Sequence, residues 1–220
     1  MRTKSTFFQR LCNGDTEGNT PPATPALTIA LGRVDYSGKT ILITGGGFGM
    51  GIAMCRSFAV FKAAQVVMVG RNEALLQTTA AELAVEHPET KFTPIAADIF
   101  SEADIERLCS SLGASPAVLV KNAGYMPVPK PFIDMDLDDW WAGFQINVYG
   151  SVNVTLTYLR HRAAQPFLNG PGVVITLNTI AAYGYDLPNP SSLPFSRHLN
   201  SQVLLFIPFH WRRVVGLANV

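Results

Sequence analysis

A glycine-rich turn between an apolar run and a helical pattern is the part of this chain best suited to chemistry. The apolar run ends at Thr44, and the helical pattern opens at Met50. The turn follows the spacing Thr-Gly-x-x-x-Gly-x-Gly, with glycines at Gly45, Gly49 and Gly51. Free N–H groups at a helix N-terminus favour an anion such as a phosphate, and glycines let a pyrophosphate approach the backbone. The alternative is a tight strand-to-helix connection that binds no ligand.

The end of the next predicted strand, 65–69, indicates which nucleotide would bind. With this strand, residues 40–69 form one βαβ unit of the expected size, roughly 30 residues. In dinucleotide sites an acidic residue at this strand end holds the adenosine ribose. Here Gly70 takes that place, and Arg71 follows with a planar fork suited to a 2′-phosphate. The pattern favours NADP over NAD, the alternative being that Arg71 is a surface residue of the next helix.

Composition fits one domain with a substantial core and excludes several kinds of partner. The chain has 220 residues, 48% hydrophobic and 15% charged, with a formal net charge of +1. This balance gives no electrostatic reason to bind nucleic acid or an anionic membrane. No apolar run approaches the ~18 residues of a membrane helix. We therefore expect no nucleic acid and no membrane as partners.

Cysteine and histidine positions predict neither a disulfide framework nor a metal site. The three cysteines are odd in number and widely spaced, at Cys12, Cys55 and Cys109, and the histidines show no ligand spacing. This usage is typical of a reducing compartment, so we expect a cytoplasmic protein. A weaker alternative is organelle targeting by residues 1–20, which are basic and hydroxyl-rich before Asp15.

Strand and helix patterns alternate from residue 38 onward. Residues 1–37 are rich in Thr, Pro, Gly and Asn and are predicted to be a flexible leader before a domain at 38–220. Expected strands are 40–44, 65–69, 91–96, 117–121 and 173–177, and expected helices are 50–62, 72–85, 101–111 and 136–164. Ser101 and Asp104 predict a cap and capping box for the third helix, and the aspartates from 134 to 139 predict an N-cap for the fourth.

These strands are apolar without alternation, as strands buried on both faces are. They predict an α/β fold, a doubly wound parallel sheet (Rossmann-like) in a single domain, with its ligand at the carboxyl ends of the strands.

With its motifs in this order, the chain resembles the short-chain dehydrogenase/reductase family over about residues 38–182. The glycine turn from Thr44 matches the family's cofactor turn, and Asp98 falls after the third strand, where the family contacts the adenine. Asn122-Ala123-Gly124 matches the end of the family's Asn-Asn-Ala-Gly motif, with Lys121 in place of the first asparagine. Asp98 could instead cap a turn, and Asn122 could satisfy backbone groups between strands.

The resemblance also implies residues for catalysis. Asn147 matches the helix asparagine that supports the active-site lysine through water, although it could be a helix-bending polar residue. Thr179, after the fifth strand, stands at the position of the catalytic serine and could make the same hydrogen bond. The implied activity is hydride transfer between a nicotinamide cofactor and a small carbonyl or alcohol substrate. A homo-oligomer is compatible with this assignment.

The chain departs from the family at the two residues that move the proton. Leu193 and Arg197 stand where the family has tyrosine and lysine, and leucine cannot donate a proton. Tyr183 or Tyr185 could substitute from a loop, although neither has a basic partner four residues later. Residues 213–217 resemble the sixth strand, and the chain stops at Val220, before the family's substrate-covering segment. The alternatives are thus an inactive nucleotide-binding protein acting by association, or a non-functional fragment.

Overall fold

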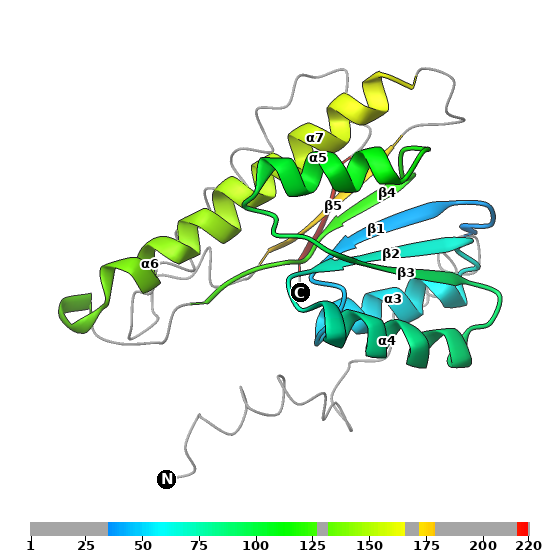
Figure 1. Ribbon diagram of the computed structural model, residues 1–220, viewed down its shortest axis with the longest axis horizontal. Coiled ribbons are helices and arrows are strands. Elements are labelled where there is room, and N and C mark those ends of the chain that lie inside the picture. Colours follow the sequence, from blue (N-terminus) through cyan, green and yellow to red (C-terminus); the bar gives the residue numbers. More distant parts are fainter. Residues whose placement is uncertain (1–34, 127–131, 166–171, 179–214, 220) are drawn as a thin grey trace, which may run out of the picture.

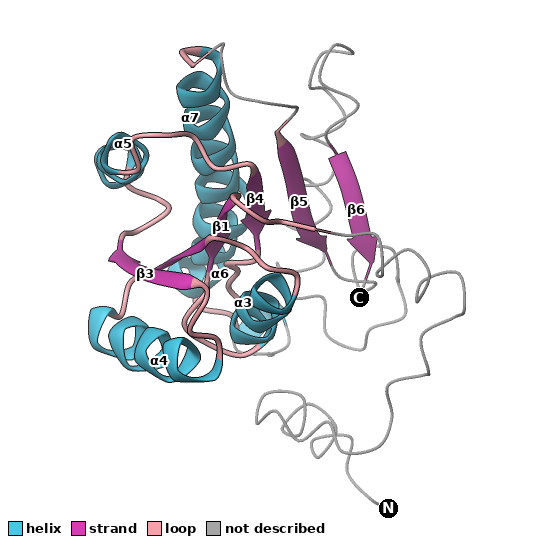
Figure 2. Cartoon of the chain, turned by 90° about the vertical axis from the view of Figure 1, so that its right-hand side faces the viewer, coloured by secondary structure: helices cyan, strands magenta, loops and turns pink. Residues whose placement is uncertain are grey.

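A parallel β-sheet covered by helices on both faces forms the centre of the molecule (Figures 1 and 2). The computed structural model describes residues 35–126, 132–165, 172–178 and 215–219. The strands are β1 (Thr40–Thr44), β2 (Gln65–Gly70), β3 (Lys91–Ala96), β4 (Val118–Lys121), β5 (Val173–Asn178) and β6 (Val215–Asn219). The helices are α3 (Met50–Val60), α4 (Glu73–Glu86), α5 (Glu102–Ser111), α6 (Leu137–Phe144) and α7 (Ser151–Ala163), with a short 3-10 turn at Phe132–Asp134.

The strand order is β3-β2-β1-β4-β5-β6, and every pairing is parallel. The order reverses between β1 and β4, so the chain winds outward in both directions from β1. In such sheets ligands bind at the carboxyl ends of the strands, beside this reversal. The predicted doubly wound α/β fold is confirmed.

Two hydrophobic layers hold the helices against the sheet. Successive strand residues point to opposite faces, so Ile41 and Ile43 pack toward α3 and α4, while Leu42 packs toward α5 and α7. All three side chains are fully buried. Their burial on both faces explains the continuous apolar runs in the sequence.

The predicted helix at 136–164 is a helical run in three parts. Between α6 and α7, residues Gln145–Gly150 form a π-helix. Asp136 caps α6 as expected, because its carboxylate accepts hydrogen bonds from the N–H groups of Asp138 and Asp139. The widened segment contains Asn147, which therefore sits at a local irregularity of the helix.

Tyr36, two residues before the predicted start of the domain, contacts α3. Its ring packs on Phe58 with ring centroids 5.0 Å apart. Its backbone N–H donates to the carbonyl of Phe61 at 2.9 Å. Tyr36 therefore packs with the domain, and the division between a leader and the domain near residue 37 stays a prediction.

None of the described helices is long and apolar enough to cross a membrane.

Candidate nucleotide-binding site

The turn after β1 is shaped by glycines that no other residue could replace. Gly45 and Gly49 have φ angles of +69° and +55°, in the left-handed region that favours glycine. A Cβ added to Gly51 would lie 1.9 Å from the carbonyl oxygen of Gly45. The first turn of α3 therefore packs directly against the end of β1, which only glycine permits.

The N-terminus of α3 has no capping side chain. Its N-cap is Gly49, and the first turn carries no acidic residue. By contrast, α4, α5 and α6 are capped by the side chains of Asn72, Ser101 and Asp136. Uncapped N–H groups at a helix N-terminus suit an anionic ligand. Met50, exposed at 56%, is the first residue of this helix.

Thr44 and Asn122 join the glycine turn to the end of β4. The Thr44 hydroxyl accepts hydrogen bonds from the backbone N–H groups of Asn122 and Ala123, both at 3.1 Å. The Asn122 amide donates to the carbonyl oxygens of Thr44 and Gly45, also at 3.1 Å. Asn122 thus satisfies backbone groups between the strands, which is one of the two roles that the sequence predicts for it. Gly124 follows and is exposed at the same edge.

Asp98 follows β3 and Arg71 follows β2, and both strands lie on the opposite side of β1 from β4. Arg71 is exposed and follows Gly70, the last residue of β2. Asp98 accepts a hydrogen bond from the N–H of Phe100 at 3.0 Å, so it caps its own turn. The hydrogen bonds that the structure gives for Asp98 leave its second carboxylate oxygen unused. A contact of this carboxylate with adenine stays a prediction.

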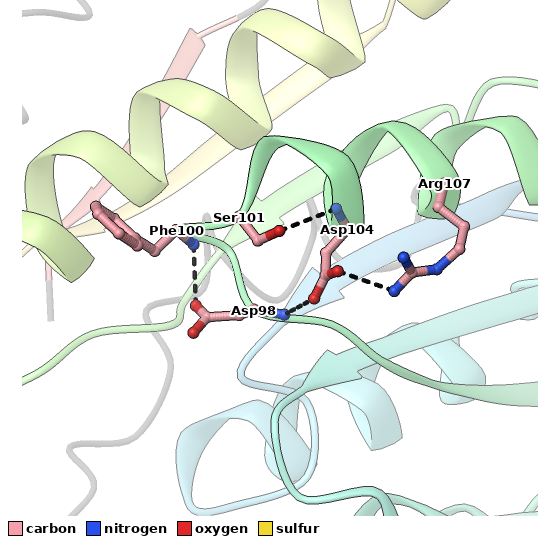
Figure 3. A network of polar contacts seen from close by, with 5 residues as sticks. All are labelled: Asp98, Phe100, Ser101, Asp104 and Arg107. Atoms are coloured by element: carbon pink, nitrogen blue, oxygen red, sulfur yellow. Dashed lines mark hydrogen bonds and ion pairs between the residues drawn. The ribbon is translucent and has the colours of Figure 1, made fainter.

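Asp104 positions the backbone of Asp98 (Figure 3). Its carboxylate accepts from the Asp98 N–H at 2.9 Å and from Arg107 at 2.9 Å. These hydrogen bonds, that of Asp98 foremost, lower the pKa of Asp104 below its ordinary value. Ser101 caps α5 as predicted, but the box is not closed, because the Ser101 N–H donates to the carbonyl of Asp98. The predicted capping box is therefore wrong in its second half.

Asn147 holds the segment that follows Gly124. Its amide accepts from the N–H of Tyr125 and donates to the carbonyl of Tyr125, both at 2.8 Å. The side chain is 1% exposed. The Tyr125 hydroxyl donates to Asp139 of α6, and this hydrogen bond raises the pKa of Tyr125. Support of a water by Asn147 stays a prediction. Tyr125 was not identified from the sequence, because its contact with Asn147 joins residues 22 positions apart. Asp104 was expected only as part of a capping box, and its hydrogen bond to the N–H of Asp98 was not predicted.

The structure brings most of the predicted cofactor residues to one edge of the sheet. Thr44 and the glycines end β1, Arg71 follows β2, Asp98 follows β3, and 122–124 follow β4. Thr179 comes directly after β5 but lies outside the described residues, as do Tyr183, Tyr185, Leu193 and Arg197. Within the described residues, no group of three His, Cys, Asp or Glu side chains could hold a metal ion.

Residues 39–186 match the family model described as short chain dehydrogenase, which is well over half of the chain. The chain belongs to the short-chain dehydrogenase/reductase family. Among its curated relatives is the uncharacterized oxidoreductase YvaG of Bacillus subtilis, 31% identical over 59% of this chain and 48% of that protein. Another is the serine 3-dehydrogenase of Agrobacterium fabrum, 32% identical over 66% of this chain and 55% of that enzyme. This short-chain dehydrogenase/reductase spans about half the length of the curated relatives it matches.

Solved structures agree with the fold. A short-chain type dehydrogenase/reductase from Mycobacterium marinum has a TM-score of 0.70 and 25% identity, covering 79% of this chain and 69% of that one. A gluconate 5-dehydrogenase from Burkholderia cenocepacia, solved with NADP and tartrate, has a TM-score of 0.72 and 24% identity, covering 86% and 72%. A Burkholderia phymatum member solved with NAD has a TM-score of 0.71 and 21% identity, covering 84% and 65%. Both dinucleotides thus occur among proteins of this fold.

Proposed function

We propose that this chain is an NADP-dependent oxidoreductase acting on a small carbonyl or alcohol substrate. The pyrophosphate would bind at Gly45, Gly49, Met50 and Gly51, the 2′-phosphate at Arg71, the adenine at Asp98, and the ribose side at 122–124. NADP supplies the hydride chemistry when bound. We place the protein in the cytoplasm, in line with the free thiols of Cys55 and Cys109.

The observation that carries this proposal is the close approach of Gly51 to Gly45 at the uncapped N-terminus of α3. A methyl group at Gly51 would overlap the Gly45 carbonyl, so the backbone of the first turn of α3 lies in direct contact with the backbone that follows β1. Together with the uncapped N–H groups of α3, this geometry suits a pyrophosphate at the helix N-terminus. A tight connection without a ligand would need the same glycines, so the free N–H groups of α3 are what favours the pyrophosphate.

The choice of NADP rests on the end of β2. Gly70 places no carboxylate beside the adenosine ribose, and Arg71 offers two parallel donors to a 2′-phosphate. On the catalytic side, we assign Thr179 to the orientation of the substrate oxygen and Asn147 to the support of a water. Both roles come from the family resemblance.

Arg71→Ala tests the NADP assignment. Its loss removes charge-assisted hydrogen bonds to the 2′-phosphate, so NADPH affinity should fall roughly 10- to 100-fold while NADH affinity stays unchanged. Fluorescence titration of the purified chain measures both. The matched control is Arg160→Ala, which removes an exposed arginine of α7 and should change neither the NADPH affinity nor the NADH affinity. Equal loss for NADPH and NADH, or none for either, would contradict the role of Arg71.

A second candidate function is nucleotide binding without catalysis. The observation that favours it is the presence of Leu193 and Arg197 where the family has tyrosine and lysine. Both functions predict NADPH binding, so a screen of small carbonyls that follows NADPH oxidation decides between them. Turnover supports the oxidoreductase, and binding without turnover of any substrate supports the inactive protein.

A further inference from the structure

Lys121 is a buried lysine at the carboxyl edge of the sheet. It is the last residue of β4 and only 5% exposed. A buried ammonium is costly unless polar groups surround it. The family's motif has a neutral asparagine at this position, so this chain carries a charge where the motif has none.

Polar residues of the neighbouring strands flank Lys121. In the parallel register it lies between Thr44 of β1 and Thr176 of β5. Residues in register point to the same face of a sheet, and both threonines are buried, at 3% and 1% exposure. The Thr176 hydroxyl has no hydrogen-bond partner in the part of the chain that the structure describes. A buried hydroxyl without a partner is unusual in a purely structural position.

Helix α7 and the π-helix add two more polar groups on this face. Lys121 shares its face with Leu119, two residues earlier, and Leu119 belongs to the same hydrophobic cluster as Val154 of α7. Ser151 precedes Val154 by three residues within α7, so these two residues share a helix face. Asn147 lies in the π-helix and bonds to the backbone of Tyr125, four residues after Lys121. Asn147 and Ser151 are both buried. We call Thr44, Lys121, Asn147, Ser151 and Thr176 the β4–β5 polar cluster.

The β4–β5 polar cluster and Arg71 lie on opposite sides of the glycine turn. Arg71 follows β2, which pairs with one side of β1, and Lys121 ends β4, which pairs with the other side. A dinucleotide with its pyrophosphate at the turn and its 2′-phosphate at Arg71 must direct its nicotinamide half toward β4 and β5. Lys121 is a cation at the edge of that half.

Resting on the proposed NADP site, we propose that Lys121 binds the nicotinamide half of the cofactor, its ammonium donating hydrogen bonds to the ribose hydroxyls beside the Thr176 hydroxyl. An ammonium is a donor with no acceptor, and a vicinal diol offers acceptor oxygens. The oxidised nicotinamide ring carries a positive charge that the reduced ring lacks. Because like charges repel, Lys121 also favours NADPH over NADP⁺.

Lys121→Met and Lys121→Asn test this inference in the full chain. Met keeps most of the stem without the charge, and Asn is the family residue. Three probes are titrated by fluorescence or calorimetry: NADPH, NADP⁺ and adenosine 2′,5′-bisphosphate, which fills the adenosine half alone. Lys91→Met is the matched control, because it removes an exposed lysine at the first residue of β3, at the opposite end of the strand from the candidate site. Thermal melts report that each variant folds.

We expect both Lys121 variants to lose roughly tenfold in NADPH affinity, to lose less for NADP⁺, and to bind the bisphosphate as the original chain does. The control should match the original chain for all three probes. Unchanged NADPH affinity in a folded variant overturns the role of Lys121, as does equal loss for the bisphosphate. Failure of both variants to fold assigns Lys121 to folding and overturns it too. If the original chain binds none of the probes, the proposed NADP site itself fails.

Discussion

Gly51 shows how closely the backbone packs at the end of β1. Its α-carbon faces the Gly45 carbonyl, and Gly45 in turn lies against the amide of Asn122. Single residues without side chains thus determine the shape of the turn, while Thr44 and Asn122 fix it to β4 through hydrogen bonds. Changes at these positions should affect stability and nucleotide binding together.

Gly51→Ala should destabilise the protein by about 1–3 kcal/mol and weaken NADPH binding at least about tenfold, because the new methyl group must displace the end of β1. Urea unfolding and NADPH titration measure the two effects. Gly113→Ala is the control, since Gly113 has nothing within 4 Å of its added Cβ, although unlike Gly51 it has a positive φ, +66°. It should cost about 1 kcal/mol through backbone strain alone and leave NADPH affinity unchanged. A Gly51 variant that binds NADPH normally would contradict the site.

At the scale of elements, the junction between β3 and α5 depends on one carboxylate. Asp104 lies in the first turn of α5, and its carboxylate reaches back to the N–H of Asp98 after β3 (Figure 3). The π-helix between α6 and α7 has a similar role for the segment after β4, through Asn147 and Tyr125. Each contact connects a helix to a strand end at the candidate site.

Asp104→Asn should lower stability at neutral pH but not in acid. The pKa of Asp104 is lowered in the folded state, so its stabilising effect is present above the unfolded pKa and is lost as pH falls through the folded pKa. Asn keeps an acceptor for the Asp98 N–H without the charge. Urea unfolding from pH 7 to below pH ~3 should therefore bring the two proteins together in acid. Glu106→Gln, exposed on the same helix, is the control. A stability difference that does not change with pH would contradict the role of the charge.

At the scale of the molecule, one sheet connects the two proposed halves of the cofactor site. The order β3-β2-β1-β4-β5 places the proposed adenosine side and the β4–β5 polar cluster on either side of β1. Buried thiols lie on both faces of this sheet, and burial raises the pKa of Cys55 to about 12 and that of Cys109 to about 11. A ligand that touches the ends of several strands should stabilise the whole sheet.

NADPH should therefore raise the melting temperature of the chain. A ligand that binds only the native state adds about 2.7 kcal/mol at 100 times its dissociation constant. Thermal melts with NADPH and NADH measure this, and NADPH should give the larger rise. Adenosine, which lacks the phosphates, is the control ligand. A folded chain whose melt neither cofactor shifts would contradict both functions considered above.

The sequence by itself determined the elements, because their signals are local. The strand Thr40–Thr44 matches its predicted bounds, since an apolar run buried on both faces ends where burial ends. The strand Lys91–Ala96 also matches its predicted bounds, although it lies at the edge of the sheet and is only partly buried. Ser101 and Asp136 cap their helices as expected, because a cap bonds to N–H groups two or three residues away. The glycine spacing predicted the turn for the same reason.

Only the tertiary structure decided which distant groups meet. Asp104 bonds to Asp98 and leaves the capping box open, and Asn147 bonds to Tyr125, 22 residues away. Lys121 meets Thr176 through a strand register that no local pattern encodes. Such contacts depend on how strands and helices pack, and a side chain with several partners in reach takes the one that packing brings closest. The roles of Thr179 and of the residues at 193 and 197 stay predictions from the sequence.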